Sequence, residues 1–206
     1  MSLKIYGIPR SRAVRTLWMA HELAIPHELV QIKPGAEGSR KPEYLRLNPN
    51  GQVPFVDDDG LILWESFAIN LYLAKKHGGP IGPASLAEDG QMTMWTLWAV
   101  NEIEPAAGII LVNTIELPIH ERRPAAVTAA LDQLATPLQI LEDKLVKDGG
   151  YLVGRRFTVA DLNLICCLFY LRNAPQALAG KPGIRAWYDR AMARPANRAA
   201  FALRGD

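Results

Sequence analysis

The stretch NPNGQVPFVDDDGLILWESF, residues 48–67, decides the fold of the first part of the chain. Its first four residues favour a turn, and a proline at position 54 then opens a short apolar strand. The run DDDG at 57–60 predicts a hairpin loop leading into a second strand, Leu61 to Trp64. A serine at position 66 opens a helix that extends to Lys76 and is closed by Gly78-Gly79-Pro80.

The sequence before this stretch adds two more strands and two helical segments. Strands are predicted over Leu3 to Tyr6 and Glu28 to Ile32, a helix over Arg12 to Ala24, and a helical turn over Pro42 to Leu47. The order β-α-β-α-β-β-α predicts a mixed four-stranded sheet covered by helices, as an α/β domain over residues 1–78.

The second part of the chain shows only helical patterns. Residues 79–86 are rich in Gly and Pro and are a predicted linker, and 87–206 are a predicted all-helical domain. Leu86 to Leu117 is expected to form one long, bent helical stretch. The last helix is expected from about Gly183 to Ala193, with Pro195 as its stop.

Composition excludes several classes of protein. The chain of 206 residues is 49% hydrophobic and 21% charged, which is typical of globular proteins, and its net charge of +2 is too small for electrostatic binding of nucleic acid. The run Leu162 to Leu171 is far shorter than the ~20 residues of a membrane span. Cys166 and Cys167 are adjacent and unsuited to a disulfide framework, and the four histidines lack metal-ligand spacing. We therefore expect a cytoplasmic protein with no metal, membrane or nucleic-acid partner.

The first segment that could carry chemistry lies around Ser11, where the predicted strand gives way to a helix. Unpaired N–H groups at a helix start favour an anion, and Arg10, Arg12 and Arg15 add positive charge. A thiolate at this position would accept a hydrogen bond from the Ser11 hydroxyl. The alternative is that Ser11 only caps the helix.

Two further segments follow the same logic. A cis bond before Pro54 would turn the N–H and C=O groups of Val53 outward, toward an extended peptide ligand, whereas a trans proline would simply start an edge strand. Ser66 would cap the third helix, whose first N–H groups could bind a carboxylate, and Glu65 could receive an ammonium group. Ordinary capping is again the alternative. In the predicted topology all three segments lie at one edge of the sheet.

Over nearly its whole length, the chain resembles the cytosolic glutathione transferases. The segments that carry the resemblance are Asn48 to Pro54, Glu65 to Ile69, and Phe157 to Asp161, in this order and spacing. The resemblance implies a thioredoxin-like, glutathione-binding domain followed by an all-α helical bundle, assembled as a homodimer. It implies an enzyme of detoxification that conjugates the thiolate of glutathione to electrophilic, mostly apolar small molecules.

The resemblance also implies roles for individual residues. The pattern Gly7-Ile8-Pro9-x-Ser11-x-x-x-Arg15 is similar to that of the plant phi class, in which the matching serine contacts the sulfur of glutathione. Ser11 is therefore expected to activate the thiol, with Arg12 as the second candidate and Tyr6 as the third. The remaining contacts to glutathione implied by the resemblance are Gln52, Val53 and Pro54 on its backbone, Glu65 and Ser66 on its γ-glutamyl end, and Arg40 or Lys41 on its glycyl carboxylate.

Other functions on the same fold stay open at this point. One is a non-enzymatic protein that binds glutathione or another ligand, and another is a protein-interaction module. Among enzymes, a glutathione-dependent peroxidase, reductase, isomerase or dehalogenase is also compatible with the residues. The sequence does not identify the second substrate, because the shape of an apolar pocket determines it.

Overall fold

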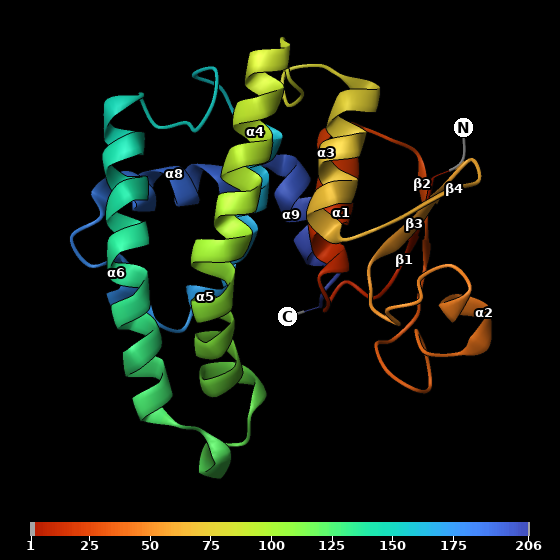
Figure 1. The fold of residues 1–206 in the computed structure, drawn as a ribbon, viewed down its shortest axis with the longest axis horizontal. Coiled ribbons are helices and arrows are strands. Elements are labelled where there is room, and N and C mark those ends of the chain that lie inside the picture. The colour runs from red at the N-terminus through yellow and green to blue at the C-terminus, as the bar shows by residue number, and fades with distance from the viewer. Residues whose placement is uncertain (1–2, 206) are drawn as a thin grey trace. The chain divides into compact units, whose positions relative to one another are not determined.

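The computed structural model describes residues 3–205, which form two compact units (Figure 1). The first unit contains the residues up to Ala84 together with the C-terminal segment from Met192 onward. The second unit is Ser85–Ala191. The sequence-based division at 79–86 places the C-terminal segment in the helical domain, whereas its contacts group it with the first unit.

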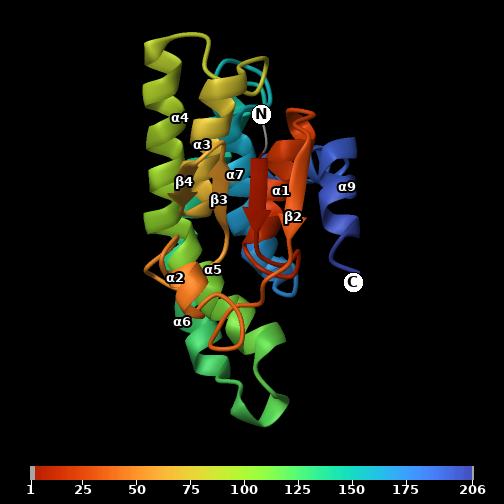
Figure 2. The same cartoon turned by 90° about the vertical axis from the view of Figure 1, so that its right-hand side faces the viewer.

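A four-stranded sheet is the centre of the first unit. Its strands are β1 (Leu3–Tyr6), β2 (His27–Val30), β3 (Phe55–Asp58) and β4 (Leu61–Trp64), in the spatial order β2-β1-β3-β4. β1 pairs with β2 in parallel, whereas the pairs β1–β3 and β3–β4 are antiparallel. Figure 2 shows the strands side by side in this order. The predicted mixed sheet is thereby confirmed.

Helices cover both faces of this sheet. α1 (Ala13–Glu22) and α3 (Ser66–His77) lie together on one face, and the short α2 (Pro42–Leu45) lies on the other (Figure 1). α1 is shorter than the predicted helix from Arg12 to Ala24. The side chains buried between the sheet, α1 and α3 are apolar and include Ile5, Leu17, Val56, Ile69 and Leu73.

A further helix, α9 (Pro195–Ala202), packs against α1 within the first unit. The sequence-based prediction was wrong here, because Pro195 begins a helix instead of only ending the preceding one. Proline is suited to the first turn of a helix, since its missing N–H would have no intrahelical partner there.

The second unit is helical. The predicted continuous stretch from Leu86 to Leu117 is interrupted by two π-helical turns, Ala99–Ile103 and Val112–Glu116. The first of these turns ends two residues before Pro105, which lacks an N–H group and cannot continue the regular hydrogen-bond ladder. The helices of this unit are α4 (Leu86–Trp98), α5 (Glu104–Leu111), α6 (Pro124–Lys147), α7 (Val159–Leu168) and α8 (Pro182–Met192).

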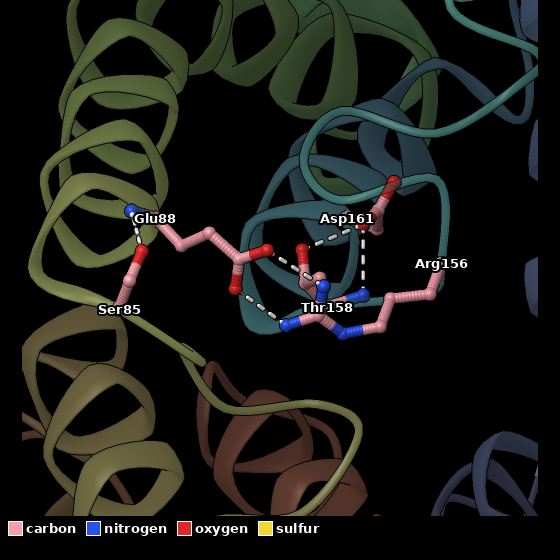
Figure 3. Close-up of polar contacts among 5 residues, drawn as sticks. All are labelled: Ser85, Glu88, Arg156, Thr158 and Asp161. Carbon is pink, nitrogen blue, oxygen red and sulfur yellow. Dashed lines mark hydrogen bonds and ion pairs between the residues drawn. The ribbon is translucent and has the colours of Figure 1, made fainter.

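The start of α7 is the best-defined polar cluster of the second unit (Figure 3). The N–H and hydroxyl groups of Thr158 donate to the Asp161 carboxylate at 2.8 and 2.7 Å, and Thr158 and Asp161 form a capping box at the start of the helix. Beside it, Arg156 forms a bidentate ion pair with Glu88 at 2.9 and 2.6 Å, and Ser85 accepts a hydrogen bond from the Glu88 N–H. The cluster joins the starts of α4 and α7.

Within residues 3–205, none of the helices combines the length and the hydropathy required to cross a bilayer. The same residues contain no group of three or more His, Cys, Asp or Glu side chains placed to hold a metal ion.

Candidate active site

The register of the sheet brings the three predicted segments to one edge. Tyr6, the last residue of β1, pairs with Phe55, the first residue of β3, and Phe55 pairs with Trp64, the last residue of β4. The loop after Tyr6, the residues before Phe55 and the residues after Trp64 therefore all leave the sheet at the same edge. Residues 7–12, 52–54 and 65–66 are thus neighbours in space, as the topology predicts.

Ser11 lies just before α1, and its hydroxyl is already hydrogen-bonded. It donates to the carbonyl oxygen of Ile8 at 2.7 Å and accepts from the N–H of Ala13 at 3.1 Å. Ser11 therefore satisfies one of the unpaired N–H groups of the helix start, while Arg12, an exposed residue, is the N-cap itself. Ser11 as a residue remains partly exposed.

Gly7 allows the Ser11 loop and the segment before β3 to approach closely. Its φ of +150° is one that other residues rarely adopt, and a Cβ atom built on it would lie 2.7 Å from the Cβ of Ala13. The same Cβ would lie 3.3 Å from the Cβ of Val53 and 3.6 Å from the Oγ of Ser11. Val53 and the Ser11 hydroxyl therefore both lie close to Gly7.

The Val53–Pro54 peptide bond is cis, as one of the two alternatives predicted. Asn48, which is buried, supports the turn before it: its amide nitrogen donates to the carbonyl of Gln52 at 2.9 Å, and its side-chain oxygen accepts from the N–H of Asn50 at 3.1 Å. Gln52 is exposed, so its side chain is accessible to a ligand at this edge.

Of the two basic candidates before α2, Arg40 is the one that contacts this turn. A Cβ built on Gly51, whose φ is +62°, would lie 2.8 Å from the Cγ of Arg40. The hydroxyl of buried Ser39 donates to the carbonyl of Gly51 at 2.7 Å and fixes the connection. Lys41 is the N-cap of α2, and its side chain is exposed.

At the start of α3, Glu65 has a strained backbone, with φ +70° and ψ +106°. Such conformations cost on the order of 1–3 kcal/mol for a residue other than glycine, and they concentrate at functional sites. Glu65 is the N-cap, so the expectation that Ser66 caps this helix was wrong. Ser66 is instead the first helical residue and is buried.

Arg15 is a site residue whose role the sequence did not reveal. It was expected only to add positive charge near Ser11, but it is buried, with 2% of its surface exposed. Its guanidinium lies 4.4 Å from the centre of the Phe67 ring and donates to the Ser66 hydroxyl at 3.5 Å. Through these two contacts, the buried guanidinium of Arg15 holds the first turn of α3 in place. The signal available in the sequence was the spacing of four residues from Ser11, which places Arg15 one helical turn further along on the same face of α1.

Tyr6 occupies the other face of the sheet. Its ring stacks on Phe55, with centroids 4.4 Å apart, and meets Tyr44 near α2 edge to face. Burial raises the pKa of the Tyr6 phenol above its usual value, with a further contribution from the negative charges of Asp57 and Glu28.

Comparisons with known proteins agree with this geometry. The family model for the glutathione S-transferase N-terminal domain matches residues 1–75, and that for the C-terminal domain matches 101–195. Glutathione S-transferase F13 of Arabidopsis thaliana is 31% identical over 95% of this chain and 93% of its own. Glutathione S-transferase GstB of Escherichia coli K12 is 32% identical over 95% of this chain and 96% of its own.

A solved structure of glutathione S-transferase I bound with lactoylglutathione superposes with a TM-score of 0.88 at 30% identity, covering 98% of this chain and 99% of its own. The family models together span more than half of the sequence, and the relatives match it from end to end. The chain therefore belongs to the glutathione S-transferase family.

Proposed function

We propose that the protein binds glutathione at the edge of the sheet where residues 7–12, 52–54 and 65–66 meet, and that Ser11 activates the thiol for conjugation to apolar electrophiles. The observation that carries this proposal is the register that brings Ser11, Val53 and Ser66 to one edge of the sheet. The solved relative described above holds a glutathione derivative, which is consistent with this type of ligand.

The binding contacts follow from what each segment offers. The backbone of Val53, before the cis bond to Pro54, can pair with the extended backbone of glutathione, with Gln52 beside it. The first N–H groups of α3 at Ser66 can bind the γ-glutamyl carboxylate, and Glu65 can receive its ammonium group. Of the two basic candidates for the glycyl carboxylate, we favour Arg40 over Lys41, because Arg40 lies against Gly51.

Thiol activation requires preferential stabilisation of the thiolate. A free thiol has a pKa of about 8.5. A hydroxyl that donates to an anion contributes about 1.5–3 kcal/mol, but the Ser11 proton must first leave the carbonyl of Ile8, and that neutral hydrogen bond contributes about 0.5–1.5 kcal/mol. The net gain, roughly 1.3 kcal/mol between the middles of these ranges, lowers the pKa of the thiol by about one unit. The start of α1 adds ~0.3–1 kcal/mol.

Ser11 is favoured over the other two donor candidates by position and chemistry. Arg12 is exposed at the start of α1 and is the second candidate. Tyr6 is held in an aromatic cluster with Phe55 and Tyr44 on the α2 face, and its raised pKa makes it a weaker hydrogen-bond donor.

We also propose that the protein works as a homodimer, in which the first unit of each subunit faces the second unit of its partner. Leu86, Met94 and Leu97 are exposed apolar side chains on one face of α4, and Ile109 is exposed on α5. Apolar side chains exposed together on one face of a helix are a feature of interaction surfaces. Light scattering at micromolar concentration should give the mass of two chains, and a monomeric mass would contradict the proposal.

The test of the function combines binding with turnover. Glutathione should raise the melting temperature in proportion to the logarithm of its concentration above Kd, because it binds only the folded state. A panel of electrophiles and peroxides, assayed with glutathione, should then give conjugation. Binding without turnover on any member of the panel would favour a carrier, and turnover only on peroxides would favour a peroxidase. No thermal shift at millimolar glutathione would contradict the proposed site.

A further inference from the structure

The loop that bears Ser11 is hydrogen-bonded to the residues that follow α9. Arg10 donates from Nε to the carbonyl of Arg204 at 2.9 Å and from Nη2 to the carbonyl of Gly205 at 3.2 Å. In return, the guanidinium of Arg204 donates to the carbonyl of Pro9 at 3.3 Å. These three hydrogen bonds, made by Pro9, Arg10, Arg204 and Gly205, are called the C-terminal clamp below.

The other half of the clamp is itself firmly anchored. α9 packs on α1 within the first unit (Figure 2), and the Phe201 ring meets the Trp18 ring edge to face at 6.2 Å. Just before α9, Arg194 forms a bidentate ion pair with Glu22 at 2.6 and 2.7 Å. Glu22 also accepts from the indole N–H of Trp18 at 2.9 Å. Arg194 fixes the start of α9 to α1, and Phe201 fixes its last turn. The carbonyls that follow α9 therefore have a defined position.

The chemistry of the clamp suits an arginine in particular. The carbonyls of Arg204 and Gly205 follow the last turn of α9, where the helix dipole is negative and favours a cation. A guanidinium presents several donors in a fixed plane, so one side chain can bind two carbonyls at once. Ordering an exposed arginine side chain costs conformational entropy, which these two hydrogen bonds offset.

We propose that the C-terminal clamp is a positioning device for Ser11. Within the loop, the Ser11 hydroxyl is hydrogen-bonded to the carbonyl of Ile8. Between these two residues, Pro9 and Arg10 are hydrogen-bonded to the residues that follow α9. Together these hydrogen bonds keep the Ser11 oxygen where the sulfur of glutathione can meet it. The inference rests on the proposed function of Ser11, and it makes Arg10 and Arg204 positioning residues that need not touch the substrate.

The test uses full-length Arg10→Met and Arg204→Met, with Arg198→Met, an exposed arginine on α9, as the matched control. The first readout is hydrogen exchange of the Ser11, Ala13 and Val14 amides without glutathione. These amides should exchange several-fold faster in both clamp variants than in the wild type, whereas in Arg198→Met they should exchange at the wild-type rate. Unchanged exchange in both clamp variants would overturn the inference.

The second readout is the ionisation of bound glutathione, followed by thiolate absorbance against pH. In Arg10→Met the pKa should rise by about 0.3–0.7 units, with a two- to fivefold loss of kcat at pH 6.5. The KM for glutathione should stay within about twofold, because the clamp does not contact the binding groups. The double variant Arg10→Met/Arg204→Met should be close to the worse single variant, since both residues join the same two segments.

Arg10→Lys separates geometry from charge, because lysine keeps the positive charge but cannot donate to both carbonyls from one plane. In Arg10→Lys, amide exchange of the Ser11 loop should stay as fast, and the pKa of bound glutathione as high, as in Arg10→Met. If lysine restores both quantities to their wild-type values, the effect of Arg10 is one of charge alone, and the positioning role is overturned.

Ser11→Ala is measured in parallel. If it raises the pKa while Arg10→Met does not, the clamp has no catalytic role. If Ser11→Ala has no effect, the proposed role of Ser11 itself has failed and the clamp's catalytic role fails with it, whereas the exchange readout still reports whether the clamp holds the loop.

Discussion

Replacing Ser11 by alanine removes one hydroxyl that has two hydrogen bonds in the structure, and each has its own consequence. The bond it donates is the one available to the thiolate, and the bond it accepts, from the N–H of Ala13, supports the start of α1. The variant should therefore change both the ionisation of bound glutathione and the stability of the protein.

The size of the first effect follows from the competition with Ile8. An unoccupied hydroxyl would be expected to shift the thiol pKa by ~1–2 units. Because the proton must leave the Ile8 carbonyl, we expect Ser11→Ala to raise the pKa of bound glutathione by only about one unit, and to slow conjugation near pH 6.5 about tenfold. Affinity for glutathione should hardly change, since Gln52, Val53 and Ser66 supply most of the binding groups.

The second effect is a loss of roughly 0.5–2 kcal/mol in the free energy of unfolding, as for removal of a helix-capping hydroxyl. Thermal unfolding measures it separately. The thiolate titration is made well below the melting temperature, so lower stability does not affect it.

Ser66→Ala is the matched control, because it removes a hydroxyl at the other end of the same site. The Ser66 hydroxyl accepts a hydrogen bond from the buried Arg15, so its loss should disturb the start of α3 and weaken the binding of glutathione, while the pKa of the bound thiol stays unchanged. A titration that is identical in Ser11→Ala and wild type would refute the reasoning. The same measurement on variants of Arg12 and then Tyr6 would identify the donor in that case.

Three further outcomes are expected. Burial alone would raise the pKa of Asp58, but hydrogen bonds from Lys76 and Tyr72 outweigh it and lower that pKa. Asp58→Asn should therefore cost about 1–3 kcal/mol in urea unfolding at pH 7. The difference from wild type should begin to shrink as the pH falls below ~3.9, the ordinary pKa of an unfolded aspartate, and disappear only below the lowered pKa of the folded carboxyl. Asp161→Ala should cost more than about 3 kcal/mol, since it leaves several buried donors unpaired; a melting temperature close to that of wild type would contradict this. Gly7→Ala should lower both stability and turnover, because its Cβ would lie 2.7 Å from another Cβ, and unaltered kinetics would show that the loop can move aside.

Short-range chemistry explains what the sequence determined by itself. The turn residues of 48–51, the DDDG loop and the capping box of Thr158 and Asp161 act within three or four residues, so their patterns predict strands, hairpin and helix start directly. The order of these elements then predicts the mixed sheet. That order also predicts which loops share an edge, because β3 and β4 must run antiparallel across a tight hairpin.

Only the tertiary structure decided the features that depend on contacts between distant parts of the chain. Arg10 meets Arg204 across 194 residues, and no local pattern around either arginine indicates the other. Arg15 is buried because α3 packs over it and Phe67 lies across its guanidinium. The hydrogen bond from the Ser11 hydroxyl to the Ile8 carbonyl depends on the conformation of the loop after β1. Sequence patterns record local hydrogen-bonding and hydrophobic periodicity, whereas these positions follow from the packing of elements whose separation along the chain is large.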